Sequence, residues 1–183
     1  KAPEEWWLPY SNPTFMCSAY DNMHASWSST HESTWNVVKN NHFVSGQFVW
    51  TGWDYLGEPT PYGFPARSSY FGIIDLAGFP KDIYYMYQSE WTQKPVLHLF
   101  PHWNWLLGQQ IDMWCYFNHA DAVELFVNGK SQGLKQKKPN EFHVKWRVNY
   151  EPGSVKVVAY EHGKAVREEE IHTAGAPDHI RLT

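Results

Sequence analysis

Two carboxylates and two aromatic rings follow one short apolar segment. Residues of these types at this spacing could bind a ligand or act on it. Asp54 and Glu58 come directly after Phe48-Val49-Trp50, with Trp53 and Tyr55 between them. Carboxylates accept hydrogen bonds, while indole and phenol rings offer flat apolar faces with a polar edge. Carboxylates directly after a buried strand suit an active site, because the active site of an α/β barrel lies at the C-terminal ends of its strands. The pattern alone leaves a second interpretation open, in which Asp54 caps a turn and Glu58 is solvated.

Two helices and one strand are expected around these residues. Thr30 is a helix-capping residue and Glu32 adds an acid to the first turn, so we expect a helix over about 31–40. The next apolar run, 43–50, carries few charges, which is typical of a parallel strand covered on both faces. Apolar side chains at three-to-four spacing predict a second helix over 80–91. One strand cannot form a sheet alone, so we expect its partners upstream in a longer chain.

The second half of the chain has the pattern of an antiparallel β domain. Short runs of alternating or apolar residues predict strands at 96–100, 111–118, 123–127, 142–148, 155–161 and 165–173. Asn128-Gly129 and His162-Gly163 are tight-turn signals between such runs. This spacing is typical of an immunoglobulin-like β-sandwich. A boundary near 92–95 gives two domains, 1–93 and 94–183, and the fold class α/β plus all-β.

Composition excludes several classes of protein. The chain has 183 residues, 43% of them hydrophobic and 19% charged, which suits a packed globular core. Its net charge of −4 argues against binding to nucleic acid, and no stretch approaches the ~18 apolar residues of a membrane span. Aromatic residues make up 17% of the chain, which fills a core and also suits sugar binding. Glycine-rich phosphate loops and zinc-ligand spacing are missing, and Cys17 and Cys115 are expected to be separate thiols. We therefore expect no cofactor.

Beyond these patterns, nearly the whole chain resembles β-galactosidases of glycoside hydrolase family two. The motifs that carry the resemblance are MCSAYDN (16–22), GQFVWTGWDYLGEPTPYG (46–63), SSYFGIIDLAGFPKD (68–82), YYMYQSEW (84–91), VELFVNGKSQG (123–133) and HTAGAPDHIRLT (172–183). The resemblance implies that 48–50 is the last strand of a (β/α)8 barrel and 80–91 its last helix. The β domain would then be the immunoglobulin-like domain that follows the barrel, with its end leading into a further element.

The resemblance also implies an activity, the hydrolysis of terminal β-linked galactose with retention. Such enzymes use two carboxyl groups about 5–5.5 Å apart, one as acid/base and one as nucleophile. In the family both are glutamates, in motifs that precede the region resembled here. No glutamate of this chain matches either motif, so we expect no catalytic residue in it and no activity from the chain alone.

What the resemblance leaves in this chain is part of a sugar pocket. Trp50 matches a tryptophan that forms the apolar floor under the sugar. Asp54 matches an acidic position nearby, as an acceptor for sugar hydroxyls or as a residue that orients its neighbours. Tyr55 and Glu58 are candidates for hydrogen bonds at the rim, and Arg67 for pairing with one of the carboxylates. For the neighbouring Trp53, a position in the core is as strongly expected as one in the pocket.

Three other positions bear on the site. Asp21 and Asn22 are expected to brace a loop beside the nucleophile. Some relatives bind sodium or magnesium near the sugar, but Phe71 stands where one uses an asparagine ligand, so we expect no metal. Galactose is favoured over glucuronate, mannose or fucose by the resemblance, although Arg67 would suit an acidic sugar.

A non-catalytic carbohydrate-binding or scaffolding module is the competing function, with the β domain as its working part. Its sugar platform would come from Trp103, Trp105, Trp114 and Trp146. The mid-strand positions of Trp114 and Trp146 favour the core, while 103–105 is expected to be exposed or packed on the first domain. An upstream Asn-Glu motif would favour the enzyme, and an unrelated upstream domain the module.

The resemblance also suggests where the protein works and with what. Relatives are often exported, so a periplasmic or secreted location is expected, although no signal peptide is visible. The expected partners are a carbohydrate substrate and the upstream part of the same polypeptide. The sequence does not indicate the oligomeric state.

Overall fold

The computed structural model describes residues 18–25, 27–60 and 62–177, so Cys17 and the outer ends of the two expected domains lie outside the described residues. Within them, two helices precede seven strands: α1 (His31–Asn40), α2 (Asp82–Trp91), β1 (Leu97–Phe100), β2 (Gln110–Phe117), β3 (Ala122–Val127), β4 (Lys130–Lys135), β5 (His143–Asn149), β6 (Ser154–Glu161) and β7 (Lys164–His172). All six strands expected from the sequence are present, each shifted by at most one residue at either end.

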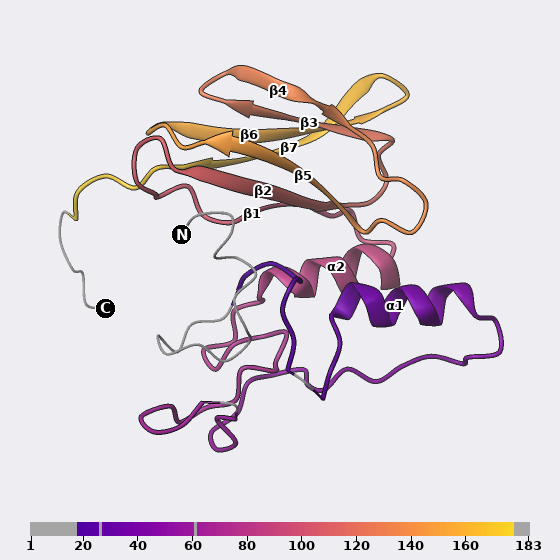
Figure 1. Ribbon diagram of the computed structural model, residues 1–183. Coiled ribbons are helices and arrows are strands. Elements are labelled where there is room, and N and C mark those ends of the chain that lie inside the picture. The colour runs from indigo at the N-terminus through magenta and orange to yellow at the C-terminus, as the bar shows by residue number, and fades with distance from the viewer. Residues whose placement is uncertain (1–17, 26, 61, 178–183) are drawn as a thin grey trace.

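The strands form two antiparallel sheets, ordered β1-β2-β5 and β4-β3-β6-β7. Figure 1 shows the two sheets stacked face to face, with both helices on the far side of the three-stranded sheet. Successive side chains of a strand point to opposite faces, so alternate residues of each sheet meet in the middle. Met113, Leu125, Trp146 and Val157 are among the buried side chains of this core. The mid-strand position of Trp146 therefore predicted its burial correctly.

The tight turns predicted at Asn128-Gly129 and His162-Gly163 are present, and all four residues have positive φ, as two-residue hairpins require. The first turn leads into β4, a strand that the sequence analysis missed. β4 is an edge strand with almost every residue exposed. It therefore lacks the buried, apolar alternate positions from which a strand is predicted.

Both predicted helices are present. α1 has the predicted bounds, and the Thr30 hydroxyl accepts a hydrogen bond from Ser33 N at 3.3 Å, so Thr30 is its N-cap. α2 begins at Asp82 rather than at residue 80, because Pro80 still pairs with Ile74 in an isolated antiparallel bridge.

The helices pack on the outer face of the three-stranded sheet and form a second apolar cluster there. Met86 and Tyr87 of α2 are buried against Phe100, Trp114 and Tyr116 of the sheet. The prediction that Trp114 is a core residue is thus confirmed, although it faces the helices rather than the other sheet. This cluster fixes the helices, and the segments that flank them, to the β domain.

The strand predicted over 43–50 is absent from the structure, and that prediction is wrong for the described residues. Phe43 and Phe48 are fully exposed, while Val49 packs against the helical cluster. A strand requires a neighbouring backbone for its hydrogen bonds. No other described segment lies beside residues 43–50 in a sheet, so the apolar run stays unpaired.

Trp103 corrects another expectation, because it is neither exposed nor packed on the helical part of the chain. Its side chain is fully buried in the core between the sheets, and its indole N–H donates to Glu151 O at 3.0 Å. Trp105 is partly buried against the same core and stacks on His102, with ring centroids 4.5 Å apart. Neither of the two described helices is long and apolar enough to cross a membrane.

Candidate functional site

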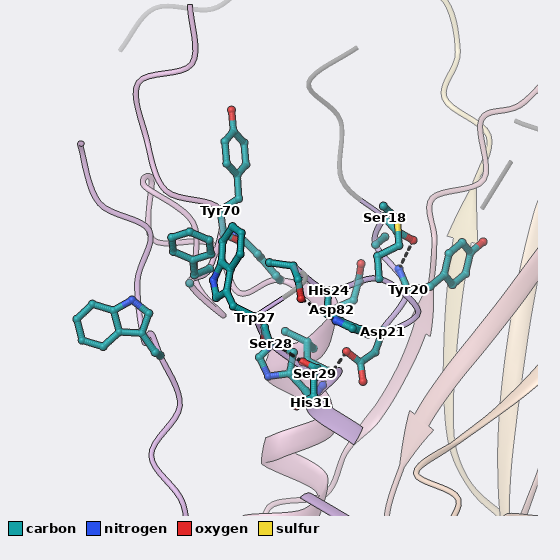
Figure 2. A pocket seen from close by; sticks show the side chains of 18 of the residues that line it. Ser18, Tyr20, Asp21, His24, Trp27, Ser28, Ser29, His31, Tyr70 and Asp82 are labelled. Atoms are coloured by element: carbon teal, nitrogen blue, oxygen red, sulfur yellow. Dashed lines mark hydrogen bonds between the residues drawn. The ribbon is translucent and has the colours of Figure 1, made fainter. Parts of the chain in front are cut away.

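A cleft of about 650 Å³ opens beside the first turn of α1. One side comes from residues between 18 and 31, and the other from residues 70–72 and 80–83, with Trp50 and Glu58 also in the lining. Figure 2 shows Asp21 where α1 begins at His31, with further polar and aromatic side chains along the same cleft. Aromatic and charged side chains from distant parts of the sequence therefore meet here.

Trp50 is held at the cleft by two backbone segments that run side by side. Residues 51–54 lie parallel to residues 71–74: Ile73 N donates to Thr51 O at 3.0 Å, and Asp54 N donates to Ile74 O at 2.9 Å. The peptide bond between Trp50 and Thr51 is cis. The Trp50 side chain is 72% exposed, so its ring is open to a ligand in the cleft.

Gly72 is required where the backbones of these two segments come close together. A Cβ built at this position would lie 2.1 Å from Asp54 N and 2.4 Å from the carbonyl carbon of Trp53. Both neighbours are backbone atoms, which cannot move aside as a side chain can. Only glycine permits this approach.

Asp54 lies beneath the cleft rather than in its lining. Its Oδ1 accepts a hydrogen bond from Gly72 N at 2.8 Å, and its Oδ2 is 2.6 Å from Lys81 Nζ. The Asp54 side chain is only 8% exposed, while Lys81 lines the cleft and also donates to Tyr70 O at 3.3 Å. Of the two roles expected for Asp54, the geometry favours that of orienting a neighbour.

Tyr55 joins Trp50 to Glu58 at the rim. The Tyr55 hydroxyl donates to Glu58 Oε2, and its ring meets that of Trp50 edge to face, with centroids 6.3 Å apart. This hydrogen bond is the main cause that raises the pKa of Tyr55. Glu58 lines the cleft, whereas Tyr55 does not. One carboxylate oxygen of Glu58 is therefore fixed by the protein.

Arg67 and Trp53 lie away from the cleft. The Arg67 guanidinium is 4.7 Å from the centre of the Phe64 ring, a cation–π contact. The ion pair expected between Arg67 and a site carboxylate is not among those formed by the described residues. Trp53 is 62% exposed and does not line the cleft, so the core position left open for it is not adopted.

Asp21 and His31 form the polar end of the cleft. The Asp21 carboxylate accepts hydrogen bonds from His31 N at 3.0 Å and Glu32 N at 2.7 Å, and so braces the first turn of α1. Burial raises the pKa of Asp21 to about 6, against the opposing effect of those two bonds. Burial also lowers the pKa of His31 to about 4, with a contribution from Lys81, and His31 Nδ1 lies 2.9 Å from the Tyr87 hydroxyl. An ionised acid and a neutral imidazole therefore stand together at neutral pH.

Among the lining residues that sequence reasoning did not single out are Lys81, His31 and Tyr70. Lys81 had a signal, because a cation at the N-cap of α2 opposes the helix dipole and needs another reason to be there. His31 and Tyr70 had none, since neither residue type nor spacing marks them out. In the described part of the chain, no group of three or more metal-ligating side chains is arranged around a common point.

Comparison with known proteins identifies the chain as similar to a segment of glycoside hydrolases. β-Galactosidase BoGH2A of Bacteroides ovatus is 66% identical over 181 residues, which are 99% of this chain and 21% of that protein. Other curated relatives carry the name β-glucuronidase. The family model described as a domain of unknown function, DUF4982, matches residues 108–167, within the β domain.

Solved structures agree with this similarity. A β-glycosidase from Bacteroides vulgatus superposes with a TM-score of 0.82 at 38% identity, over 96% of this chain and 21% of the other. A glycosyl hydrolase family 2 member from Bacteroides cellulosilyticus superposes with a TM-score of 0.73 at 27% identity, over 88% of this chain and 26% of the other. The resemblance to family two β-galactosidases is thus confirmed for a segment: the chain spans about a fifth of the length of the first of these relatives.

Proposed function

We propose that this chain supplies one wall of the sugar pocket of a retaining β-glycosidase that hydrolyses terminal β-linked galactose. The observation that carries the proposal is Trp50, an exposed indole fixed at the rim of a cleft that also presents Glu58 and Asp21. An apolar ring beside hydrogen-bonding carboxylates matches the two kinds of surface that a pyranose presents. The 66% identity to a β-galactosidase supports galactose as the sugar.

In this proposal residues 48–50 form the closing strand of a (β/α)8 barrel, and α2 is the last barrel helix. Phe43, Phe48 and Trp50 expose large apolar side chains close together in the sequence. Exposed apolar side chains that are scattered singly are ordinary, whereas a group of them marks a surface that another segment or molecule covers. Barrel strands from elsewhere in the polypeptide would cover Phe43 and Phe48 and provide the missing hydrogen bonds, while Trp50 stays open to the sugar. The active site of such a barrel lies where its strands end, which is where Trp50 stands.

The two stacked sheets would be an immunoglobulin-like domain, since their three- and four-stranded composition matches the seven-stranded form of that fold. The domains would divide near residues 93–94. A periplasmic or secreted location goes with this proposal. The competing function, a carbohydrate-binding module, is less well supported. Three of the four tryptophans of its expected sugar platform, Trp103, Trp114 and Trp146, have buried side chains.

The catalytic acids are proposed to come from elsewhere in the polypeptide. Asp21, Glu58 and Asp82 line the cleft, but each is bound to a neighbour: α1 amides, Tyr55 and His98. Retaining hydrolysis requires two carboxyl groups that face one sugar across about 5–5.5 Å. Both oxygens of Asp21 are taken by α1 amides, while Glu58 and Asp82 each have one oxygen on a neighbour, so the proposal gives none of the three a catalytic role.

A panel of nitrophenyl glycosides tests the proposal. The full-length gene product that contains this sequence is expected to cleave the β-galactoside faster than the glucuronide, mannoside or fucoside, while the purified 183-residue chain cleaves none. A full-length product that cleaves no glycoside, or an active 183-residue chain, would overturn the proposal.

A further inference from the structure

The charges around the cleft are unevenly distributed. Lys81 is the single lysine or arginine among the described residues that line it, whereas Asp21, Glu58 and Asp82 are all carboxylates. The imidazole of His31 adds no positive charge at neutral pH, since burial lowers its pKa to about 4. A second lining histidine, His24, is engaged with Ala25 O at 2.8 Å through Nδ1. A ligand in this cleft therefore meets a negative surface with one cation in it.

The carboxylate of Asp54, which lies beneath the cleft, compensates the positive charge of Lys81. Lys81 Nζ is 2.6 Å from Asp54 Oδ2, and the Asp54 side chain is 8% exposed, so little solvent screens the pair. Asp54 is fixed in this position because its other oxygen accepts the Gly72 amide at 2.8 Å. A second donor of Lys81 goes to Tyr70 O at 3.3 Å. An ammonium group has three donors, so one remains for a ligand.

We propose that the Asp54–Lys81 ion pair sets the specificity of this cleft, so that it takes a neutral sugar and rejects a uronic acid. Lys81 offers one N–H to a sugar hydroxyl, while Asp54 cancels the positive charge that would attract a carboxylate. Arg67, the other cation considered for an acidic sugar, is stacked on Phe64 outside the cleft. The inference rests on the proposed function, because it presumes that the cleft binds a sugar.

Competitive inhibition of the full-length gene product distinguishes the effect of the ion pair's charge on ligand binding from the effect of its hydrogen bonds. The inhibition constants of free D-galactose and free D-glucuronate are measured against hydrolysis of nitrophenyl β-galactoside. Asp54→Asn keeps an oxygen for the Gly72 amide but removes the charge. It is expected to strengthen inhibition by glucuronate relative to galactose about tenfold, because one unit charge becomes uncompensated near the ligand. High salt is expected to shrink this gain.

Three further variants control the experiment. Lys81→Met is expected to shift the ratio the other way, and also provides the test if Asp54→Asn does not fold. The double variant is expected to lose the gain, since the uncompensated cation is gone. Asp75→Asn is the matched control, because the Asp75 carboxylate accepts amides of its own turn and does not line the cleft.

The outcomes distinguish this inference from the proposed function. If wild type hydrolyses the β-galactoside but the folded Asp54→Asn and Lys81→Met variants keep its inhibition ratio, the specificity role of the ion pair is wrong and the sugar pocket stands. If wild type cleaves no nitrophenyl glycoside, the proposed function itself fails.

Discussion

His143 Nδ1 in β5 lies 2.7 Å from Glu32 Oε1 in α1, and the His143 ring stacks on Trp114 with centroids 3.6 Å apart. Both partners of this contact are mostly buried. A second histidine, His98 in β1, makes the equivalent bond to Asp82 of α2 at 2.8 Å. Each helix is thus joined to the three-stranded sheet by one carboxylate–imidazole contact, and these contacts hold the cleft segments in place.

Removing either side of the first contact is expected to destabilise the chain. Glu32→Ala and His143→Ala should each lower the free energy of unfolding by about 1–2 kcal/mol, because a buried polar partner is left unsatisfied. The double variant should cost less than the sum, with a coupling of about 1 kcal/mol. Urea unfolding of the 183-residue chain measures this. Glu168→Ala is the control, since its contact with Lys156 is more exposed and should change stability by less than about 0.5 kcal/mol. Additive effects at Glu32 and His143 would contradict the coupling.

Gly72→Ala is expected to lower stability by about 3 kcal/mol or more, because the added Cβ would overlap backbone atoms at 2.1 Å and 2.4 Å and push the two segments apart. Thermal unfolding of the chain measures the loss. Gly63→Ala is the matched control: a Cβ there meets nothing within 4 Å, and its φ is not in the left-handed region. Equal stability of the two variants would show that the segments are not packed as described.

The ionisations of Asp21 and His31 should change stability in opposite directions as pH rises. Asp21 has a pKa of about 6 when folded against 3.8 otherwise, so its contribution is present below about pH 4 and is lost as pH rises through 6. His31 has a pKa of about 4 when folded against 6.5 otherwise, so its contribution is present above about pH 6.5 and is lost as pH falls through 4. The two effects nearly cancel between pH 4 and 6.5.

Single substitutions should expose each half of this pair. Relative to wild type between pH 4 and 6.5, Asp21→Asn should gain stability as pH rises and His31→Gln should lose it, each by an amount on the order of 2 kcal/mol. Urea unfolding at several pH values gives both slopes. Parallel pH profiles for the two variants and wild type would mean that neither group titrates as its burial implies.

Much of the fold could be predicted from local chemistry. The Thr30 cap with Glu32 in the first turn predicted α1, and the dipeptide Asn128-Gly129 predicted a tight turn, where both residues have positive φ. The misses had physical causes. β4 is exposed on almost every residue, so it shows no apolar alternation, and the apolar run 43–50 has no described neighbour with which to pair.

The candidate site could be predicted less completely, because it depends on contacts between distant segments. Trp50 and Glu58 belong to one short stretch of sequence and both line the cleft, whereas Arg67 contacts Phe64 outside it. Asp54 was expected near the pocket, but its partner Lys81 lies 27 residues further on, at the start of another helix. No spacing rule connects such a pair.

Trp50→Ala in the full-length gene product tests the central claim most directly, with Trp53→Ala as the matched control, since that indole is similarly exposed but does not line the cleft. Loss of the apolar floor, about 1–3 kcal/mol, should lower kcat/KM for nitrophenyl β-galactoside by about fivefold to 150-fold, with unchanged thermal unfolding. Trp53→Ala should stay within about threefold of wild type. A folded Trp50→Ala enzyme with wild-type kcat/KM would contradict the account.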